Sequence, residues 1–418
     1  MRAAPLPEGL QQCLADRSAT PFYFIDVDAI AAEASAMKAA FDGAFADCAI
    51  AYSYKTNAAK CITTTLCDVG LHAEVVSGPE IRLAVTDGYT PERMFFDGPL
   101  KTLDELQLAV NLGVRIQLDS AAEAEEITTV AKRSYRPARI SLRGSVRRRF
   151  GWSRFGFMPN EILPIADSLA RQGLCVSGFH FNLGTNQLSP KRYGAVLRSW
   201  QSEVVALMKH CRNQDRFVID IGGGFPARSA GPNIDIPPWE DFAGAAREAV
   251  DAMGIIDDIT LVAEPGRSLV EDHGYVIYGV VAQKRRRNRR LLIVDSSGLL
   301  VSSRGSWFHP VHVSPAGPTR YDIYGSGCFE GDAIAKSARG PAHIAVGQRI
   351  ILGSAGGYDI ASARGWNRPL PAVWVHKSGE LQQVDPRTVF NEYRILDGAG
   401  DIGEERPITG LSDRPWLS

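Results

Sequence analysis

Short apolar runs alternate with segments of helical periodicity over most of the chain. Eight of these runs are typical of strands, because they are short and several are apolar on both faces, as parallel strands covered by helices are. Between them, apolar residues recur at helical spacing behind Ser, Thr or Asp residues that can cap a helix. The eight runs span residues 48–55, 71–78, 93–99, 114–120, 138–144, 176–182, 216–224 and 259–267.

Eight strand–helix repeats predict a (β/α)8 TIM-like barrel, an α/β fold, over residues 28–270. A doubly wound open sheet would alternate in the same way, and the count of eight is the reason for preferring the barrel. After about residue 275, short β-like runs separated by Gly and Pro turns predict a C-terminal all-β domain. We assign residues 271–418 to this domain together with residues 1–27, where "ATPFYFIDVDAI" can add a strand.

Composition and charge argue against a nucleic-acid-binding or membrane-binding protein and leave the predicted fold unchanged. Of the 418 residues, 45% are hydrophobic and 22% are charged, and the net charge is -1. These ordinary values give no reason to expect nucleic acid or an anionic membrane as a partner. The run "KRRRNRR" at 284–290 lies between two strand-like runs. We interpret it as a solvated hairpin tip, with a polyanion-binding patch as the lesser alternative.

The cysteines and the N-terminus bear on metal binding and location. The seven cysteines include no CxxC pair and no His/Cys cluster with zinc spacing, so we expect no metal site. Their odd number argues against the disulfide framework of a secreted protein. The N-terminus lacks the apolar core of a signal peptide, and no apolar run is long enough to span a bilayer. We therefore expect a cytoplasmic protein.

Polar residues stand where the predicted strands end. In a barrel these positions share the C-terminal rim, where active sites form. Miscellaneous turn residues would be the default there, whereas this chain has an amine, two guanidinium groups, a carboxylate, hydroxyls and three glycines. The residues are Lys55, Ser77, Gly98, Ser120, Arg143, Asn182, Thr185, Gly222, Gly223, Gly224, Glu264 and Arg267.

The loops after the last two strands indicate a phosphate site. "DIGGGFP" lets backbone N–H groups turn toward an anion, and "EPGR" brings Arg267 to the same place. A phosphate near a strand-end lysine, Lys55, points to pyridoxal phosphate, whose aldehyde forms a Schiff base with a lysine amine. Glu264 would then keep the pyridine nitrogen protonated. The alternatives are a lysine that only covers apolar surface and a salt bridge from Glu264 to Arg267.

These motifs resemble those of the fold-type III pyridoxal-phosphate decarboxylases, the ornithine/diaminopimelate/arginine decarboxylase family, from "TPFYFID" to "WNRPLPAVWV". "YSYKTN" implies that Lys55 is the Schiff-base lysine, and "AEVVSGPEI" places Glu74 where an Asp is common. "GCFEGD" resembles the family's Cys-x-x-x-Asp loop, which reaches into the partner subunit's active site. The resemblance therefore implies a homodimer in which each β domain completes the partner's active site. Cys328 would protonate the carbanion after CO2 leaves.

The resemblance also assigns roles residue by residue, through "SRFGF", "DIGGGFP", "EPGR" and "GGYDIASARGWNR" as well. The catalytic residues would be Lys55 and Cys328. The cofactor-binding residues would be Lys55, Ser77, Arg143, His180, Asn182, Thr185, Gly222, Gly223, Gly224, Glu264, Gly266, Arg267 and Tyr358. The substrate-binding residues would be Arg154, Phe329, Glu330 and Asp332.

Two positions depart from the family pattern. The strand-six motif His-x-His-x-Gly-Ser reads "HFNLGTNQ" here, so His180 is kept and Asn182 takes the position that stacks on the cofactor ring. Thr185 replaces the phosphate serine, and an amide cannot titrate near neutral pH as an imidazole does. Phe329 stands where the family has an acid that binds the substrate's distal amine, with Glu330 one position on. A phenyl ring cannot pair an ammonium ion by charge, although cation–π contact is open to it.

These features predict the decarboxylation of a small amino acid. Because of Phe329, we predict that the substrate is not plain ornithine or lysine. It would be a larger or less basic amino acid, for example a conjugated intermediate, and a carrier protein could present it. A racemase of the same fold type is one alternative, but it pairs the pyridine nitrogen with arginine, so Glu264 argues against it. An inactive regulatory protein of the same fold is another alternative. The retained residues argue against it, namely Lys55, Glu264, Arg267 and Cys328, whereas the changes at Asn182 and Phe329 keep it open.

Overall fold

All eight predicted strands form, and they close into a barrel of parallel strands. The computed structural model describes residues 6–16, 19–210, 216–303, 306–390 and 393–396. Around the barrel the order is β10-β11-β2-β3-β4-β5-β6-β9, with β9 pairing with β10, so no edge is left open. The strands are β2 (Cys48–Ser53), β3 (His72–Val75), β4 (Met94–Phe96), β5 (Arg115–Leu118), β6 (Arg139–Arg143), β9 (Val176–His180), β10 (Phe217–Asp220) and β11 (Ile259–Ala263).

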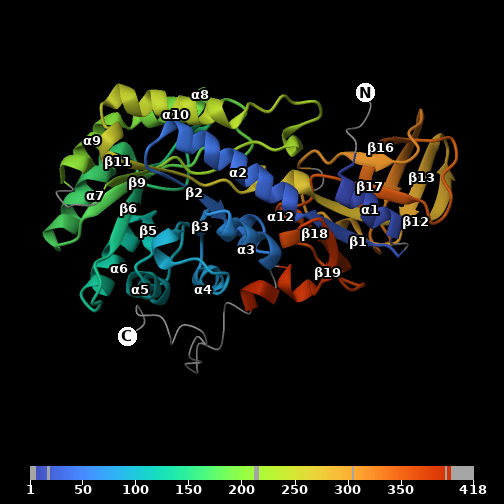
Figure 1. The fold of residues 1–418 in the computed structure, drawn as a ribbon, viewed down its shortest axis with the longest axis horizontal. Coiled ribbons are helices and arrows are strands. Elements are labelled where there is room, and N and C mark those ends of the chain that lie inside the picture. The colour runs from blue at the N-terminus through green and yellow to red at the C-terminus, as the bar shows by residue number, and fades with distance from the viewer. Residues whose placement is uncertain (1–5, 17–18, 211–215, 304–305, 391–392, 397–418) are drawn as a thin grey trace.

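Helices between these strands cover the outside of the barrel (Figure 1). Ser77, Thr102 and Ser120 accept a backbone N–H at the starts of α4, α5 and α6, which is why these helices begin at those residues. The helices are α2 (Val27–Ala44), α3 (Lys60–Asp68), α4 (Gly78–Thr86), α5 (Leu103–Leu112), α6 (Ala121–Ala131), α7 (Pro159–Arg171), α8 (Lys191–Ser199), α9 (Gln201–His210), α10 (Trp239–Met253) and α11 (Arg267–Val270).

A nine-stranded sheet forms a second body beside the barrel (Figure 1). Its strand β1 comes from the N-terminal segment and pairs with β12 and β18. The barrel together with this sheet confirms the predicted fold class. The sheet contains β1 (Phe22–Asp26), β12 (Gly274–Arg286), β13 (Arg289–Val294), β14 (Val311–Val313), β15 (Thr319–Tyr324), β16 (Ala333–Gly340), β17 (Arg349–Leu352), β18 (Ala372–Lys377) and β19 (Glu380–Val384).

The short remaining elements connect these two bodies or flank them. The basic run forms the exposed tip of the β12–β13 hairpin, with Arg286 opposite Arg289, as predicted. None of the helices in the described part of the chain has the length and apolar character that a membrane span requires. The remaining elements are α1 (Glu8–Asp16), α12 (Tyr358–Ala361) and the two-residue strands β7 (Arg147–Arg148) and β8 (Gly151–Trp152).

Candidate active site

Lys55 lies at the C-terminal end of β2, in contact with a buried carboxylate. The turn Tyr54–Thr56 follows β2 directly, and Lys55 Nζ contacts both carboxylate oxygens of Glu74, with Oε2 at 2.5 Å. Burial would lower the pKa of the Lys55 amine, but the charges of Glu74, Asp97 and Glu264 raise it above its usual value. Glu74 is fully buried, and burial raises its pKa although Lys55 opposes the shift. The pair therefore joins a half-buried ammonium to a fully buried carboxylate on the barrel rim.

Arg143 balances two carboxylates at the ends of neighbouring strands. Its Nη1 lies 3.1 Å from Asp97 Oδ1 and 3.2 Å from Asp119 Oδ1, and all three side chains are buried. Burial would raise the pKa of Asp97, but Arg143 and then His180 hold it well below its usual value. The face of the Phe155 ring lies 4.7 Å from Arg143 Cζ. Arg143 is thus fixed on several sides, which suits a residue that orients its neighbours.

Glu264 directly follows β11 and lies among buried groups that have free hydrogen-bonding capacity. His180 Nε2 lies 3.3 Å from Glu264 Oε2. The geometry is not that of a hydrogen bond, so within the described residues both His180 ring nitrogens, Glu264 Oε2 and Gln117 Oε1 have no hydrogen-bond partner. Burial would raise the pKa of Glu264, but His180 and Lys55 lower it below its usual value. An anionic carboxylate with an open oxygen fits a protonated ring nitrogen, since buried polar atoms are rarely left unpaired.

The three glycines after β10 allow close backbone approach at this rim. Gly222 has φ +67° and Gly224 has φ +92°, which is a conformation that side chains disfavour. A Cβ on Gly222 would lie 2.3 Å from the Phe181 carbonyl oxygen, and one on Gly223 would lie 2.4 Å from that of Glu264. A Cβ on Gly266 would lie 2.1 Å from a side-chain oxygen of the Lys55 turn. The glycine loops thus pack against the loops that carry Glu264 and Lys55.

The residues predicted to contact a phosphate lie together around Arg267. Arg267 Nε donates to Thr185 Oγ1 at 3.3 Å, and its Cζ lies 5.0 Å from the centre of the Tyr358 ring. The Trp307 ring lies 4.6 Å from the same Cζ. Arg267 also forms a buried ion pair with Glu271, one helical turn further on. A guanidinium held between two aromatic rings next to the glycine loop is suited to an anion.

Two predicted cofactor contacts also have local structural roles. Asn182 Oδ1 accepts the Gly184 N–H at 2.8 Å, and so it stabilises the turn after β9. Ser77 Oγ accepts the Glu80 N–H at 3.3 Å at the start of α4. Both residues lie at the C-terminal ends of barrel strands, as the sequence indicated. Their contacts with a cofactor stay predictions.

The Cys328 loop lies on the sheet domain, between β15 and β16. Cys328 is an exposed free thiol whose Sγ accepts a contact from Asn367 Nδ2 at 3.5 Å. Glu330 is exposed, whereas Asp332 is buried and accepts from Ser297 Oγ at 3.0 Å and from the backbone of Gly298 and Gly327 at 2.7 Å. Asp332 therefore holds the loop in shape. Its predicted contact with substrate stays a prediction.

Two cavities contain the other residues predicted to bind substrate. Arg154 is exposed and lines a cavity of about 600 Å³ that also contacts Asp119. Its guanidinium lies 4.0 Å from the centre of the Phe155 ring. Phe329 lines a cavity of about 820 Å³ together with Trp366, and the two rings meet edge to face at 5.5 Å.

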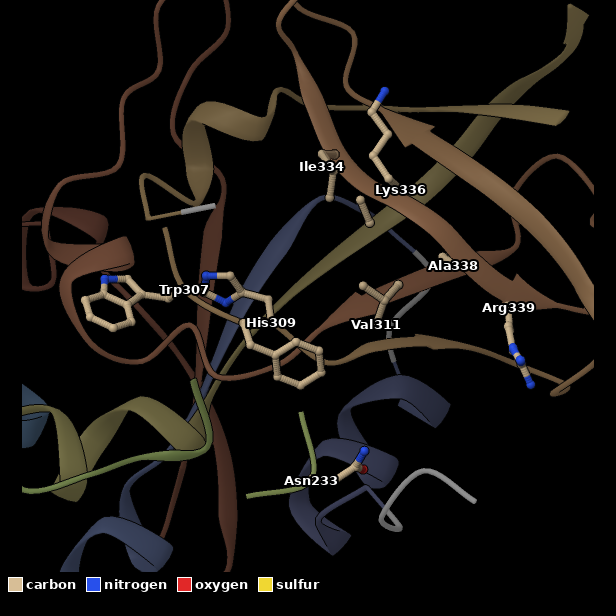
Figure 2. Close-up of a pocket in the computed structure, with 10 residues that line it drawn as sticks. Asn233, Trp307, His309, Val311, Ile334, Lys336, Ala338 and Arg339 are labelled. Carbon is tan, nitrogen blue, oxygen red and sulfur yellow. The ribbon is translucent and has the colours of Figure 1, made fainter. Parts of the chain in front are cut away.

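A further cavity of about 660 Å³ lies on the sheet domain (Figure 2). Trp307 and His309 are on one side of it, and Val311 and Arg339 are on the other (Figure 2). Trp307 connects this cavity to the candidate site because the same indole lies against Arg267. No residue that we predicted for catalysis or binding lines the cavity. We therefore place the chemistry at the barrel rim.

Sequence reasoning missed five buried residues of the site. Asp97, Asp119 and Asp220 lie inside the predicted strand runs 93–99, 114–120 and 216–224, where acids after an apolar run are also typical of ordinary turns. Gln117 interrupts the apolar run of β5, and a buried amide in a strand is a usable signal for a polar barrel interior. Glu271 follows Arg267 at i+4, a spacing that brings an acid and a base together on a helix.

Comparisons with known proteins bear on the family and the fold of the chain. Residues 27–271 match the family model described as the pyridoxal-binding domain of pyridoxal-dependent decarboxylases. The chain is 26% identical to a probable chloroplastic diaminopimelate decarboxylase of Oryza sativa, over 90% of this chain and 79% of that protein. It is 26% identical to the diaminopimelate decarboxylase of Zymomonas mobilis, over 88% and 89%. A crystal structure of the Helicobacter pylori diaminopimelate decarboxylase complexed with L-lysine superposes with a TM-score of 0.81 at 24% identity, covering 93% and 100% of the two chains.

The prediction about the substrate is wrong. We expected an amino acid unlike ornithine or lysine, for example a conjugate, because Phe329 replaces an acid. The relatives that match most of the chain are diaminopimelate decarboxylases, named for a free diamino acid. One loop position does not define a pocket: Phe329 packs on Trp366, and Glu330 beside it is an exposed acid.

Proposed function

The chain belongs to the pyridoxal-dependent decarboxylase family, and from this premise we propose that it decarboxylates diaminopimelate to lysine. It is a pyridoxal-phosphate-dependent amino-acid decarboxylase, and the finer statement concerns the substrate. The observation that carries the proposal is Lys55, held by Glu74 on the barrel rim and close enough to Glu264 for that charge to act on it. The named substrate of the relatives makes diaminopimelate the first candidate.

The residues present fit the cofactor. Lys55 would hold its aldehyde carbon and Glu264 would face its ring nitrogen, with His180 next to Glu264. The phosphate would lie at the glycine loop, with Arg267 and Tyr358 beside it. Pyridoxal phosphate, when bound, supplies an electron sink for the carbanion that loss of CO2 leaves.

The side chains of this protein would supply orientation, charge and proton transfer. Lys55 Nζ must lose a proton before it can act as a nucleophile, and the Glu74 carboxylate in contact with it is the immediate acceptor. Burial raises the pKa of Glu74, which makes it a stronger base than an exposed glutamate. Glu264 stays anionic because His180 and Lys55 lower its pKa. Arg143 keeps Asp97 from competing for the same proton.

We propose a homodimer in which the Cys328 thiol donates a proton at the partner's barrel rim. The exposure of Cys328 and of the Phe329 cavity on the sheet domain supports this, because both surfaces would be completed by a second subunit. A free amino acid needs no carrier protein, so the proposal includes none. Cys48, Cys61, Cys67 and Cys328 are free thiols, which supports a reducing compartment such as the cytoplasm.

The test combines a spectrum with a product assay. The purified protein with pyridoxal phosphate should show a visible absorption band that Lys55→Ala lacks. Trapped CO2 should appear with diaminopimelate and much less with ornithine, lysine or arginine at equal concentration. A band that substrates perturb without CO2 release would overturn decarboxylation in favour of racemisation. CO2 release from another amino acid in preference to diaminopimelate would overturn the substrate assignment.

A further inference from the structure

A second buried carboxylate lies next to Glu264 in the barrel interior. Asp220 ends β10 and is fully buried. Gln117 Nε2 bridges the two acids, because it lies 2.6 Å from Asp220 Oδ2 and 3.4 Å from Glu264 Oε1. The Gly222 N–H donates to Asp220 Oδ1 at 2.8 Å. Asp220 thus contacts the glycine loop directly and is linked through Gln117 to Glu264, the residue that would face the cofactor's ring nitrogen.

The two acids differ in their surroundings. In the part of the chain that the structure describes, the side-chain hydrogen bonds of Asp220 come from neutral donors, the Gln117 amide and the Gly222 backbone. Glu264 instead has His180 at 3.3 Å and lies within the field of the Lys55 ammonium. Two neighbouring carboxylates in an interior without water share one proton. The proton stays on the acid that has fewer positive charges nearby to stabilise its ionised form. Burial first, and then the charge of Glu264, raise the pKa of Asp220 well above its usual value.

We propose that Asp220 is a neutral carboxylic acid that keeps its proton, uses it to donate a hydrogen bond to Glu264, and so leaves Glu264 as the single anion of the pair. The role of Glu264 toward the cofactor rests on the proposed function. The arrangement of Asp220, Gln117 and Glu264 is given by their contacts and does not depend on that function. Gln117 Nε2 contacts Glu264 Oε1, which leaves Oε2 as the open oxygen of Glu264, and the same amide links Glu264 to Asp220. Asp220 is therefore a positioning residue, and it sets which oxygen of Glu264 faces the cofactor.

The first test uses substitutions that separate charge from shape. Asp220→Asn keeps the volume and a hydrogen-bond donor, and it changes the net charge only if Asp220 is ionised. In the holoenzyme, the pH midpoint of the visible band should move by less than about 0.3 pH unit in Asp220→Asn, because a neutral group is replaced by a neutral group. Glu264→Gln is the matched control, and it should move the midpoint by at least about one unit because it removes a real charge. A shift in Asp220→Asn as large as in the control would overturn the proposal.

The second test needs no variant and no turnover. In cofactor-free protein labelled with 13C at the aspartate carboxyl carbon, one resonance should still lie at the position of a protonated acid at pH 7. Asp220 is the aspartate expected to give it, because burial and the charge of Glu264 raise its pKa, whereas the pKa values of Asp28, Asp42, Asp97 and Asp385 are lowered. If every aspartate resonance titrates to the ionised position by pH 7, Asp220 is an anion and the proposal fails. Since this readout requires no substrate, its failure is distinguishable from failure of the proposed function.

Discussion

Replacing Glu271 with glutamine should remove a pH dependence from the stability of the cofactor-free protein. Glu271 follows Arg267 by one helical turn and is fully buried. Its carboxylate accepts from Arg267 and from Ser229 Oγ, the latter at 2.8 Å. Burial raises the pKa of Glu271 to about 7, even though Arg267 favours the ionised form.

The magnitude follows from that pKa. The pKa of Glu271 is about 7 in the folded protein, whereas its ordinary value is 4.5. Each unit of pKa difference between the folded and unfolded states corresponds to about 1.4 kcal/mol, so Glu271 should change the free energy of unfolding by about 3 kcal/mol across the full pH range. The folded state binds this proton more tightly than the unfolded state does. The folded protein therefore loses stability as the pH rises from about 4.5 through about 7 and levels off above that. Glutamine carries no titrating proton, so the variant should lack this loss.

The assay is the free energy of unfolding by urea, measured between pH 4.5 and pH 8.5 on cofactor-free wild type and Glu271→Gln. The difference between the two curves should change by about 3 kcal/mol across that window, in the direction that favours the variant at high pH. Glu80, whose pKa is also raised to about 7, contributes equally to both proteins and cancels. Glu125→Gln, at an exposed position of α6, is the matched control and should run parallel to wild type. Parallel curves for wild type and Glu271→Gln would refute the reasoning.

Three further predictions concern cofactor binding and assembly. Gly223→Ala should weaken cofactor binding at least tenfold and cost about 1–3 kcal/mol of stability, because its Cβ would lie 2.4 Å from the Glu264 carbonyl oxygen; fluorescence titration and urea unfolding measure the two effects. Lys55→Ala should lower the stability of the cofactor-free protein near neutral pH by about 3 kcal/mol, because Glu74 is left buried without its partner; thermal unfolding of the apoprotein checks this. Cys328→Ala should keep the visible band but lose most product formation, and mixing it with Lys55→Ala should restore about a quarter of wild-type activity if active sites are shared in a dimer. No restored activity in subunits that demonstrably exchange would contradict shared sites.

The fold could be predicted from the sequence because its signals are local. Each barrel strand is an apolar run that ends at a polar residue, and Ser77, Thr102 and Ser120 cap the helices that follow. The count of strands then selected the barrel over an open sheet. The positions of Lys55 and Glu264 on one rim followed from the same topology, since all parallel strands of a barrel end on one face.

The contacts within the site could not be predicted in the same way. Gln117 and Asp220 are 103 positions apart, and their hydrogen bond depends on two strands that meet across the barrel interior. Periodicity does not separate a buried polar residue from its apolar neighbours in a strand that is covered on both faces. The structural role of Asp332 could not be predicted for a related reason. The three groups that donate hydrogen bonds to it lie in the turn before it and in a loop some 35 residues earlier. The substrate could not be derived from Phe329 alone, because the specificity of a pocket depends on all the residues that line it.

The charge balance around Lys55 explains why these residues fit the cofactor and not merely an anion. The buried carboxylates of Glu74, Asp97, Asp119 and Glu264 are opposed by the cations of Lys55 and Arg143, and the His180 ring lies between Asp97 and Glu264, yet in the described residues no donor is hydrogen-bonded to Glu264 Oε2. An uncompensated buried charge costs several kcal/mol, so this end of the site favours a ligand that brings a positive group to Glu264. Arg267, in contact with Trp307 and Tyr358, is already paired with Glu271 through Nη1, and the rest of its guanidinium suits a negative group. A ligand with a protonated ring nitrogen at one end and a phosphate at the other satisfies both, and the open oxygen of Glu264 lies where the nitrogen would be needed.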